Sequence, residues 1–91
     1  MKQVLIIFYD LADPASNREA ITQKIKAYGS WARLGSSAYL IGTDATPVHV
    51  RDNLAKVLNA DDRVFVGVCR APSAWEGMPE EISKWILKNQ M

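Results

Sequence analysis

Asp10 occupies the position in this 91-residue chain that most invites a chemical role. It directly follows the run VLIIFY at residues 4–9, whose apolar and aromatic side chains predict a strand buried on both faces. A carboxylate at the end of such a strand has three roles open to it. It can accept hydrogen bonds from the amides of residues 12–14, act in a metal or phosphate site, or share a proton with a second carboxylate.

The metal chemistry open to the chain is narrow. One cysteine, Cys69, and one histidine, His49, exclude an intrachain disulfide and any cysteine-rich or histidine-cluster site within one chain. Carboxylates remain as ligands, and they favour hard ions such as Mg²⁺, Mn²⁺ or Ca²⁺. The sequence contains no glycine-rich phosphate loop and no Ser-His-Asp set. We expect Cys69 to be a buried structural thiol and His49 to be solvated.

A second chemistry is open to the aromatic and arginine residues, which could stack on bases and hold phosphates of single-stranded nucleic acid. The alternative is that they are ordinary core and rim residues. Eleven basic against ten acidic residues leave a net charge of +1, which is no signature of a nucleic-acid binder. The residues concerned are Trp31, Tyr39, Trp75, Arg18, Arg33 and Arg70.

The elements that position these residues follow from apolar periodicity and from capping residues. Residues 3–11 predict a strand. Two helix-start signals come next, Asp13 followed by proline and a capping box of Ser16 with Glu19, and Gly29 ends that helix. The remaining expected elements are strands at 30–34 and 37–43, a helix from the N-cap Thr46 to near Asn59, a strand within 63–70 and a helix from Pro79.

This order predicts an α+β fold: a ferredoxin-like βαββαβ antiparallel sheet with two helices on one face, plus a C-terminal helix. Ninety-one residues are too few for two independent cores, so we expect one ferredoxin-like domain over residues 1–91. The apolar N-terminal run is too short to span a membrane, and we expect a cytoplasmic protein that does not associate with membranes.

The first strand carries apolar side chains on both faces, while the two crossover helices cover one of them. Val4, Ile6 and Phe8 point one way, and Leu5, Ile7 and Tyr9 point the other. An uncovered apolar sheet face needs a partner. We therefore expect a homodimer packed through its sheet faces; the alternative is that the C-terminal helix folds over the second face of its own chain.

Four segments occur in the order and spacing of a known family: YDL at 9–11, AYG at 27–29, SAYLIGT at 37–43 and DDRVFVGV at 61–68. Over residues 3–70 the chain resembles the small CRISPR-associated adaptation protein, the ferredoxin-like, endoribonuclease-like partner of the spacer integrase. The stretch SAWEGMPEEISKWILK at 73–88 is more similar to uncharacterised bacterial SinR-family proteins. The virulence-associated protein D toxins share the expected fold class.

The resemblance implies a dimer through the sheets, with the aspartate of a YD motif near the dimer axis. That motif falls on Tyr9 and Asp10, so two copies of Asp10 could hold one Mg²⁺ or Mn²⁺ ion between protomers. The family's third-strand serine falls on Ser37, and the arginines after its aspartate are represented by Arg18. Together with Arg33, these two are the candidate nucleic-acid-binding residues.

We expect a small homodimeric, non-catalytic module with a nucleic-acid or protein partner, because one such carboxylate per chain and a near-neutral charge suit phosphodiester cleavage poorly. One alternative is a Mg²⁺-dependent phosphodiesterase or endoribonuclease with Asp10 of both protomers as catalytic and metal-binding residue. The other is a toxin-type ribonuclease or its partner.

Overall fold

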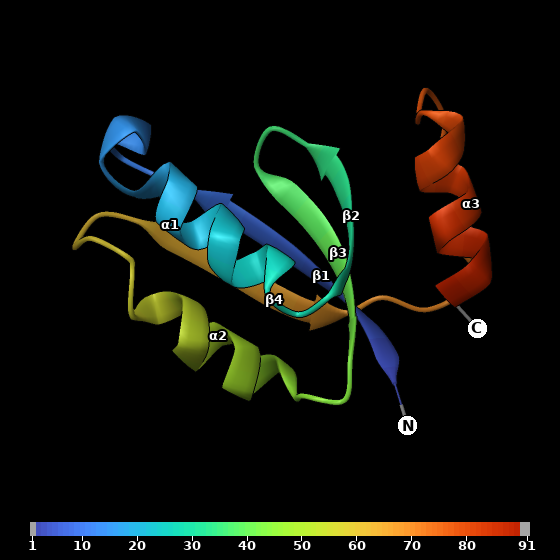
Figure 1. Ribbon diagram of the computed structural model, residues 1–91, viewed down its shortest axis with the longest axis horizontal. Coiled ribbons are helices and arrows are strands. Elements are labelled where there is room, and N and C mark those ends of the chain that lie inside the picture. The colour runs from blue at the N-terminus through green and yellow to red at the C-terminus, as the bar shows by residue number, and fades with distance from the viewer. Residues whose placement is uncertain (1, 90–91) are drawn as a thin grey trace.

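Within residues 2–89, four strands and three helices follow one another in the order expected from the sequence (Figure 1). The computed structural model describes residues 2–89. The elements are β1 (Gln3–Asp10), α1 (Pro14–Lys26), β2 (Ser30–Gly35), β3 (Ala38–Thr43), α2 (Pro47–Ala55), β4 (Arg63–Val68) and α3 (Glu80–Asn89).

The strands form one four-stranded sheet in the order β2-β3-β1-β4, and all neighbouring strands are antiparallel. The apolar strand β1 therefore lies inside the sheet, where Ile7 pairs with Tyr39 of β3 and with Val66 of β4. The fold is a small α+β fold built on an antiparallel sheet.

Helices α1 and α2 cover one face of this sheet (Figure 1). Their apolar stripes, Ile21 and Ile25 on α1 and Val50 and Leu54 on α2, are fully buried against it. The two helices also bury the β1 side chains on this face, which alternate along the strand with Val4, Ile6 and Phe8 on the other face. The whole cluster comprises Leu5, Ile7, Tyr9, Leu11, Ile21, Ile25, Tyr39, Ile41, Val50 and Leu54.

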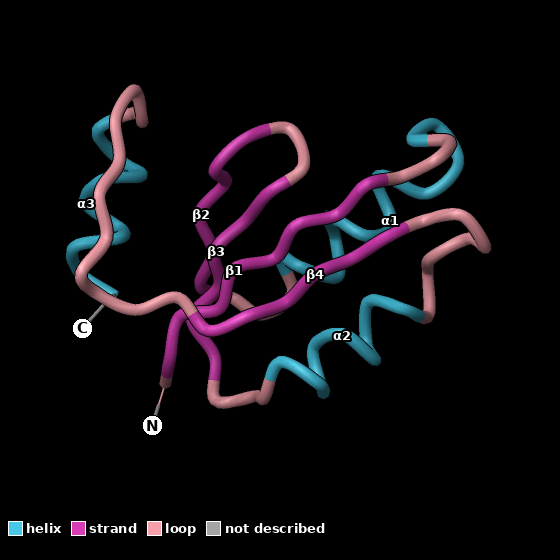
Figure 2. The backbone as a smooth tube through the Cα atoms, turned by 180° about the vertical axis from the view of Figure 1, so that it is seen from behind, coloured by secondary structure: helices cyan, strands magenta, loops and turns pink. Residues whose placement is uncertain are grey.

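The second face is partly covered by α3, which stands at one end of the sheet beside β2 in both views (Figures 1 and 2). Its Ile86 packs in a second cluster with Val4, Ala32 and Leu40. The expectation of a bare face is therefore wrong at this end, because the amphipathic helix of the same chain buries it. The partly buried residues packed against this cluster are Ile6, Leu34, Cys69, Trp75, Ile82 and Trp85.

The other end of that face stays open. Phe8 of β1 and Phe65 of β4 lie directly opposite each other, and 48% and 62% of their surfaces are exposed. Asp10 and Arg63 form the next pair in this register whose side chains point to the same face. We call these four residues the open strip.

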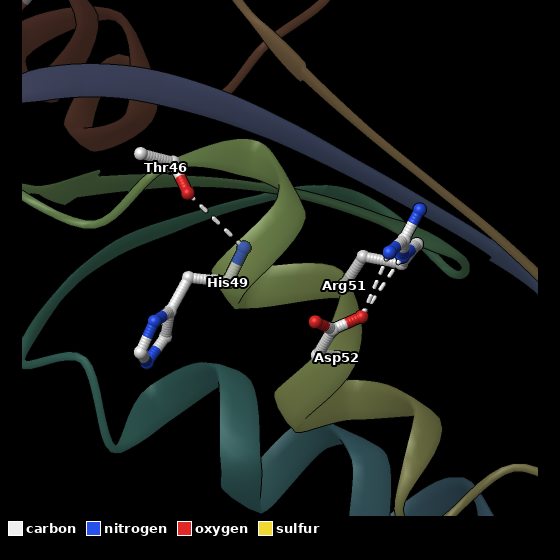
Figure 3. A network of polar contacts seen from close by, with 4 residues as sticks. All are labelled: Thr46, His49, Arg51 and Asp52. Carbon is white, nitrogen blue, oxygen red and sulfur yellow. Dashed lines mark hydrogen bonds and ion pairs between the residues drawn. The ribbon is translucent and has the colours of Figure 1, made fainter.

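The helix termini confirm some capping predictions and correct others. Thr46 caps α2, and its Oγ1 accepts a hydrogen bond from the His49 amide at 3.1 Å (Figure 3). Asp13 holds the N-cap position of α1 without a side-chain capping bond. The predicted capping box is wrong, since Ser16 lies inside the helix, and α2 ends at Ala55 rather than near Asn59.

None of the helices within residues 2–89 has the length and apolar character needed to cross a membrane.

Candidate functional site

A hollow of about 420 Å³ lies between α1 and the face of the sheet that α1 covers. We call it the basic groove. It is lined by Tyr9, Pro14, Ala15, Arg18, Glu19, Thr22, Lys26, Arg33 and Tyr39. An adjoining hollow of about 240 Å³, the hairpin hollow, extends toward the β2–β3 turn and is lined by Tyr9, Asp10, Leu11, Pro14, Arg18, Ser36 and Ser37.

One stripe of α1 forms the first wall of the basic groove. Residues three and four apart are neighbours on a helix surface, so Arg18, Thr22 and Lys26 follow one another along this stripe. Arg33 projects from the opposite wall. It pairs with Tyr39 on the neighbouring strand β3, and paired residues point to the same face of the sheet. Cations from helix α1 and from β2, the strand that follows it in sequence, thus face one hollow.

Two tyrosines form the floor of the groove. The rings of Tyr9 and Tyr39 stack with their centroids 6.5 Å apart, and only 2% and 3% of these residues are exposed. Trp31 continues the aromatic row on β2, with its ring 6.0 Å from that of Tyr39 and tilted by 59°. Unlike the tyrosines, Trp31 is 37% exposed.

The two arginines of the groove have different neighbours. The Arg18 guanidinium lies near the Tyr9 hydroxyl, whose pKa its charge lowers, and that hydroxyl donates to the Ser36 carbonyl oxygen at 3.2 Å. The Arg33 Nε donates to the Gly35 carbonyl oxygen at 3.0 Å. Each guanidinium keeps further N–H groups beyond these contacts, because arginine carries five donors.

Among residues 2–89, no ion pair neutralises the cations of the basic groove. Within residues 2–89, the ion pairs are Arg51–Asp52 and Lys84–Glu80, and neither involves a groove residue. Lys26 instead places its Nζ 4.9 Å from the centroid of the Trp31 ring. Arg18, Lys26 and Arg33 face one acid in the lining, Glu19, so the groove suits an anionic ligand.

The pKa of the Tyr9 hydroxyl is shifted by burial and by the neighbouring groove residues. Burial raises the pKa of its hydroxyl above the usual 10.0, and the adjacent Tyr39 raises it further. The positive charges of Arg18 and Arg33 act in the opposite direction on the same pKa. The Tyr9 hydroxyl is therefore a neutral hydrogen-bonding group at ordinary pH.

The residues singled out from the sequence are partly brought together. Arg18 and Arg33 line the basic groove, while Ser37 and Asp10 line the hairpin hollow, to which Arg18 also belongs. Trp75 lies elsewhere, since it packs in the cluster beneath α3 and its Nε1 donates to the Ser83 Oγ at 2.9 Å. The predicted stacking surface therefore loses this tryptophan.

The turn after β1 is held by Asp62 and not by Asp10, for which this turn was one of three roles that the sequence left open. Asp10 accepts no hydrogen bond from the amides of residues 12–14 within the described part of the chain. The Ala12 amide donates instead to Asp62 Oδ1 at 2.9 Å. Asp62 Oδ2 also accepts from the Asn59 amide at 2.7 Å and from Asn17 Nδ2 at 2.8 Å. These bonds lower the pKa of the Asp62 carboxyl below its usual value. Asp62 therefore holds this turn without a contribution from the Asp10 carboxylate.

No group of three or more histidine, cysteine or acidic side chains suited to a metal ion forms among residues 2–89.

The sequence did not single out Lys26, and although Tyr9 and Tyr39 were both named, it did not predict that their rings stack beneath one hollow. The alternation of Trp31 and Arg33 along one face of β2, together with the α1 stripe, was the signal that could have found the groove. No protein-family model matches the chain, and no curated protein sequence matches it.

Proposed function

We propose that the chain is a small homodimeric, non-catalytic module that binds nucleic acid through the basic groove. The observation that carries the proposal is the convergence of Arg18, Lys26 and Arg33 on one hollow without an ion-pair partner among residues 2–89. Phosphate groups are the anions that such oriented guanidinium groups recognise best, since two parallel N–H donors match two phosphate oxygens.

The strand order supports the ferredoxin-like class within this proposal. Read from its other edge, the sheet runs β4-β1-β3-β2, and both crossover helices lie on one face. This arrangement agrees with the split βαβ topology. A relationship to the small CRISPR-associated adaptation protein remains part of the proposal, and its support is the set of sequence segments that suggested it.

The open strip supports the homodimer. Phe8 and Phe65 expose apolar surface beside an acid, Asp10, and a base, Arg63. In a two-fold arrangement each surface patch meets its own copy, so Asp10 of one protomer can approach Arg63 of the other. Such a self-complementary patch favours a second copy of this chain over an unrelated partner.

The test of nucleic-acid binding compares two arginines in the groove with one outside it. Fluorescence anisotropy with a labelled oligonucleotide should show binding at low salt that weakens as salt is added. The variant Arg18→Gln/Arg33→Gln should bind at least about tenfold more weakly, with the logarithmic salt slope reduced by about 0.7 per arginine for a single strand.

Arg51→Gln is the matched control, because Arg51 lies on α2, where it pairs with Asp52 at 2.9 Å (Figure 3), and it does not line the groove. Its affinity should stay within about twofold of the native protein. Equal losses in the control and in the groove variants would contradict the assignment of the groove.

The position of Asp10 supports a second candidate function, that of a Mg²⁺-dependent phosphodiesterase. The residue is exposed on the open strip, where two copies could bring their carboxylates to one metal ion. RNA and DNA would be incubated with Mg²⁺ or Mn²⁺, with native protein and with Asp10→Ala. Cleavage by the native protein that Asp10→Ala abolishes would establish this candidate in place of the non-catalytic module.

A further inference from the structure

The aromatic row beside the basic groove is accessible to a ligand at one end. Tyr9 and Tyr39 are too deeply buried to offer a ring face to a ligand, whereas Trp31 is 37% exposed. The exposed indole carries Lys26 above it, with Nζ 4.9 Å from the ring centroid. A cation–π contact at an exposed site is weak, so Lys26 can leave the ring when a stronger partner arrives.

The arginines beside this row are positioned for a phosphate group. Arg18 and Arg33 line the same hollow from its two sides, and the Arg33 Nε is held by a hydrogen bond to the Gly35 carbonyl oxygen at 3.0 Å. Because Arg33 is already held by the protein, it loses less conformational entropy on binding than a free side chain would. A phosphate seated between the two arginines would be anchored on two sides.

Resting on the proposed function, we propose that the groove accepts one nucleotide of a single strand. Its phosphate binds between Arg18 and Arg33, and its base stacks on the face of Trp31 that Lys26 covers. Lys26 turns from the indole toward a phosphate of the bound strand. The cation that shields the stacking surface thus becomes a ligand contact when the strand binds.

This arrangement selects single strands over duplexes. A base within a duplex is paired and stacked on its neighbours, so it has no free face for the indole, whereas an unpaired base can be turned outward. Duplex phosphates can still reach Arg18 and Arg33 through charge alone, and such binding lacks the contribution of Trp31.

The experiment measures affinity for a single-stranded oligonucleotide and for the duplex of the same sequence, at one salt concentration. The native protein should bind the single strand about tenfold more tightly, the size expected from one stacked base. Trp31→Leu should lose that preference while keeping duplex affinity, and Trp31→Phe should retain most of it. Circular dichroism confirms that both variants are folded.

The behaviour of Lys26 has its own readout. The indole N–H resonance of Trp31 should shift on adding single strand and stay near its free position on adding duplex. Lys26→Gln should weaken single-strand binding and lower the salt slope by about 0.7. Lys84→Gln is the control, because Lys84 lies on α3, paired with Glu80.

Two failures are distinguishable. Equal affinity for duplex and single strand, or unchanged single-strand affinity in Trp31→Leu, would overturn this inference and leave the proposed function standing. Binding of neither nucleic acid at low salt would overturn the proposed function and the inference together.

Discussion

The rings of Tyr9 and Tyr39 stack at 6.5 Å with an angle of 20° between their planes, and this stack joins the end of β1 to the start of β3. The Tyr9 hydroxyl extends the connection to the hairpin turn at Ser36 and to Arg18 on α1. The side chain of Tyr9 therefore links the floor of the basic groove to α1 and to the β2–β3 turn.

Replacing this phenol should weaken the protein at neutral pH and change its alkaline behaviour. Tyr9→Phe removes a part-buried hydrogen bond to Ser36, so unfolding should require about 1 kcal/mol less free energy. In the native protein, burial makes the folded state hold the phenol proton more tightly than the unfolded chain. The contribution of Tyr9 is then complete below its unfolded pKa of about 10.0 and is lost as pH rises through the raised pKa.

Denaturant melts from pH 8 to about pH 11 would measure this effect. Stability should fall with rising pH above about 10, and the fall should be shallower in Tyr9→Phe. A variant whose pH profile runs parallel to that of the native protein would contradict the role given to this residue.

Replacing Asp62 or Asp10 by asparagine should have different effects on the melting temperature. Asp62→Asn removes the charge that accepts hydrogen bonds from the Ala12 and Asn59 amides, so the melting temperature should fall at pH 7. Asp10→Asn changes a carboxylate without a hydrogen bond in the described part of the chain, and the monomer should melt at its native temperature.

The acid limb of the stability profile follows from the same contacts. The pKa of Asp62 is lowered in the folded state, so its contribution is present above its ordinary value of 3.8 and is lost as pH falls through the lowered pKa. Thermal melts between pH 7 and pH 2 should show Asp62→Asn converging on the native protein at the acid end. A constant difference across this range would exclude the charge as the cause.

The order of elements could be predicted from the sequence because local signals mark it. Proline and threonine at helix starts, Gly29 with its φ of +89° after α1, and continuous apolar strands all act within a few residues. The packing of α3 was less certain, because an amphipathic helix fits either its own sheet or a partner. Whether α3 packs on its own sheet depends on the path of the loop that precedes it and on how much of the sheet is exposed there.

The site was only partly predictable for a related reason. Arg18 and Arg33 were identified as residue types, but their convergence depends on which face of β2 meets α1. Asp62 was missed as the acid of the turn, because its partners Ala12 and Asn17 are far from it in sequence. Such long-range hydrogen bonds leave no periodic pattern along the chain.

The open strip predicts how association should respond to a charge. Phe65→Glu places an acid in the apolar pair, so the proposed homodimer should dissociate at lower dilution than that of the native protein. Leu87→Glu on α3 is the control, since Leu87 is 71% exposed and lies outside the strip. Sedimentation equilibrium would measure the association of the native protein and of both variants. A native protein that stays monomeric at high concentration would contradict the homodimer.

The most direct test of the central claim is to map where nucleic acid touches the protein. Isotope-labelled protein would be titrated with a short single-stranded oligonucleotide while side-chain and backbone NMR resonances are followed. The account predicts that the largest shifts fall on the Arg18 and Arg33 side chains and on the Trp31 indole. Shifts confined to the strip around Phe8 and Phe65, or no shifts at low salt, would contradict it.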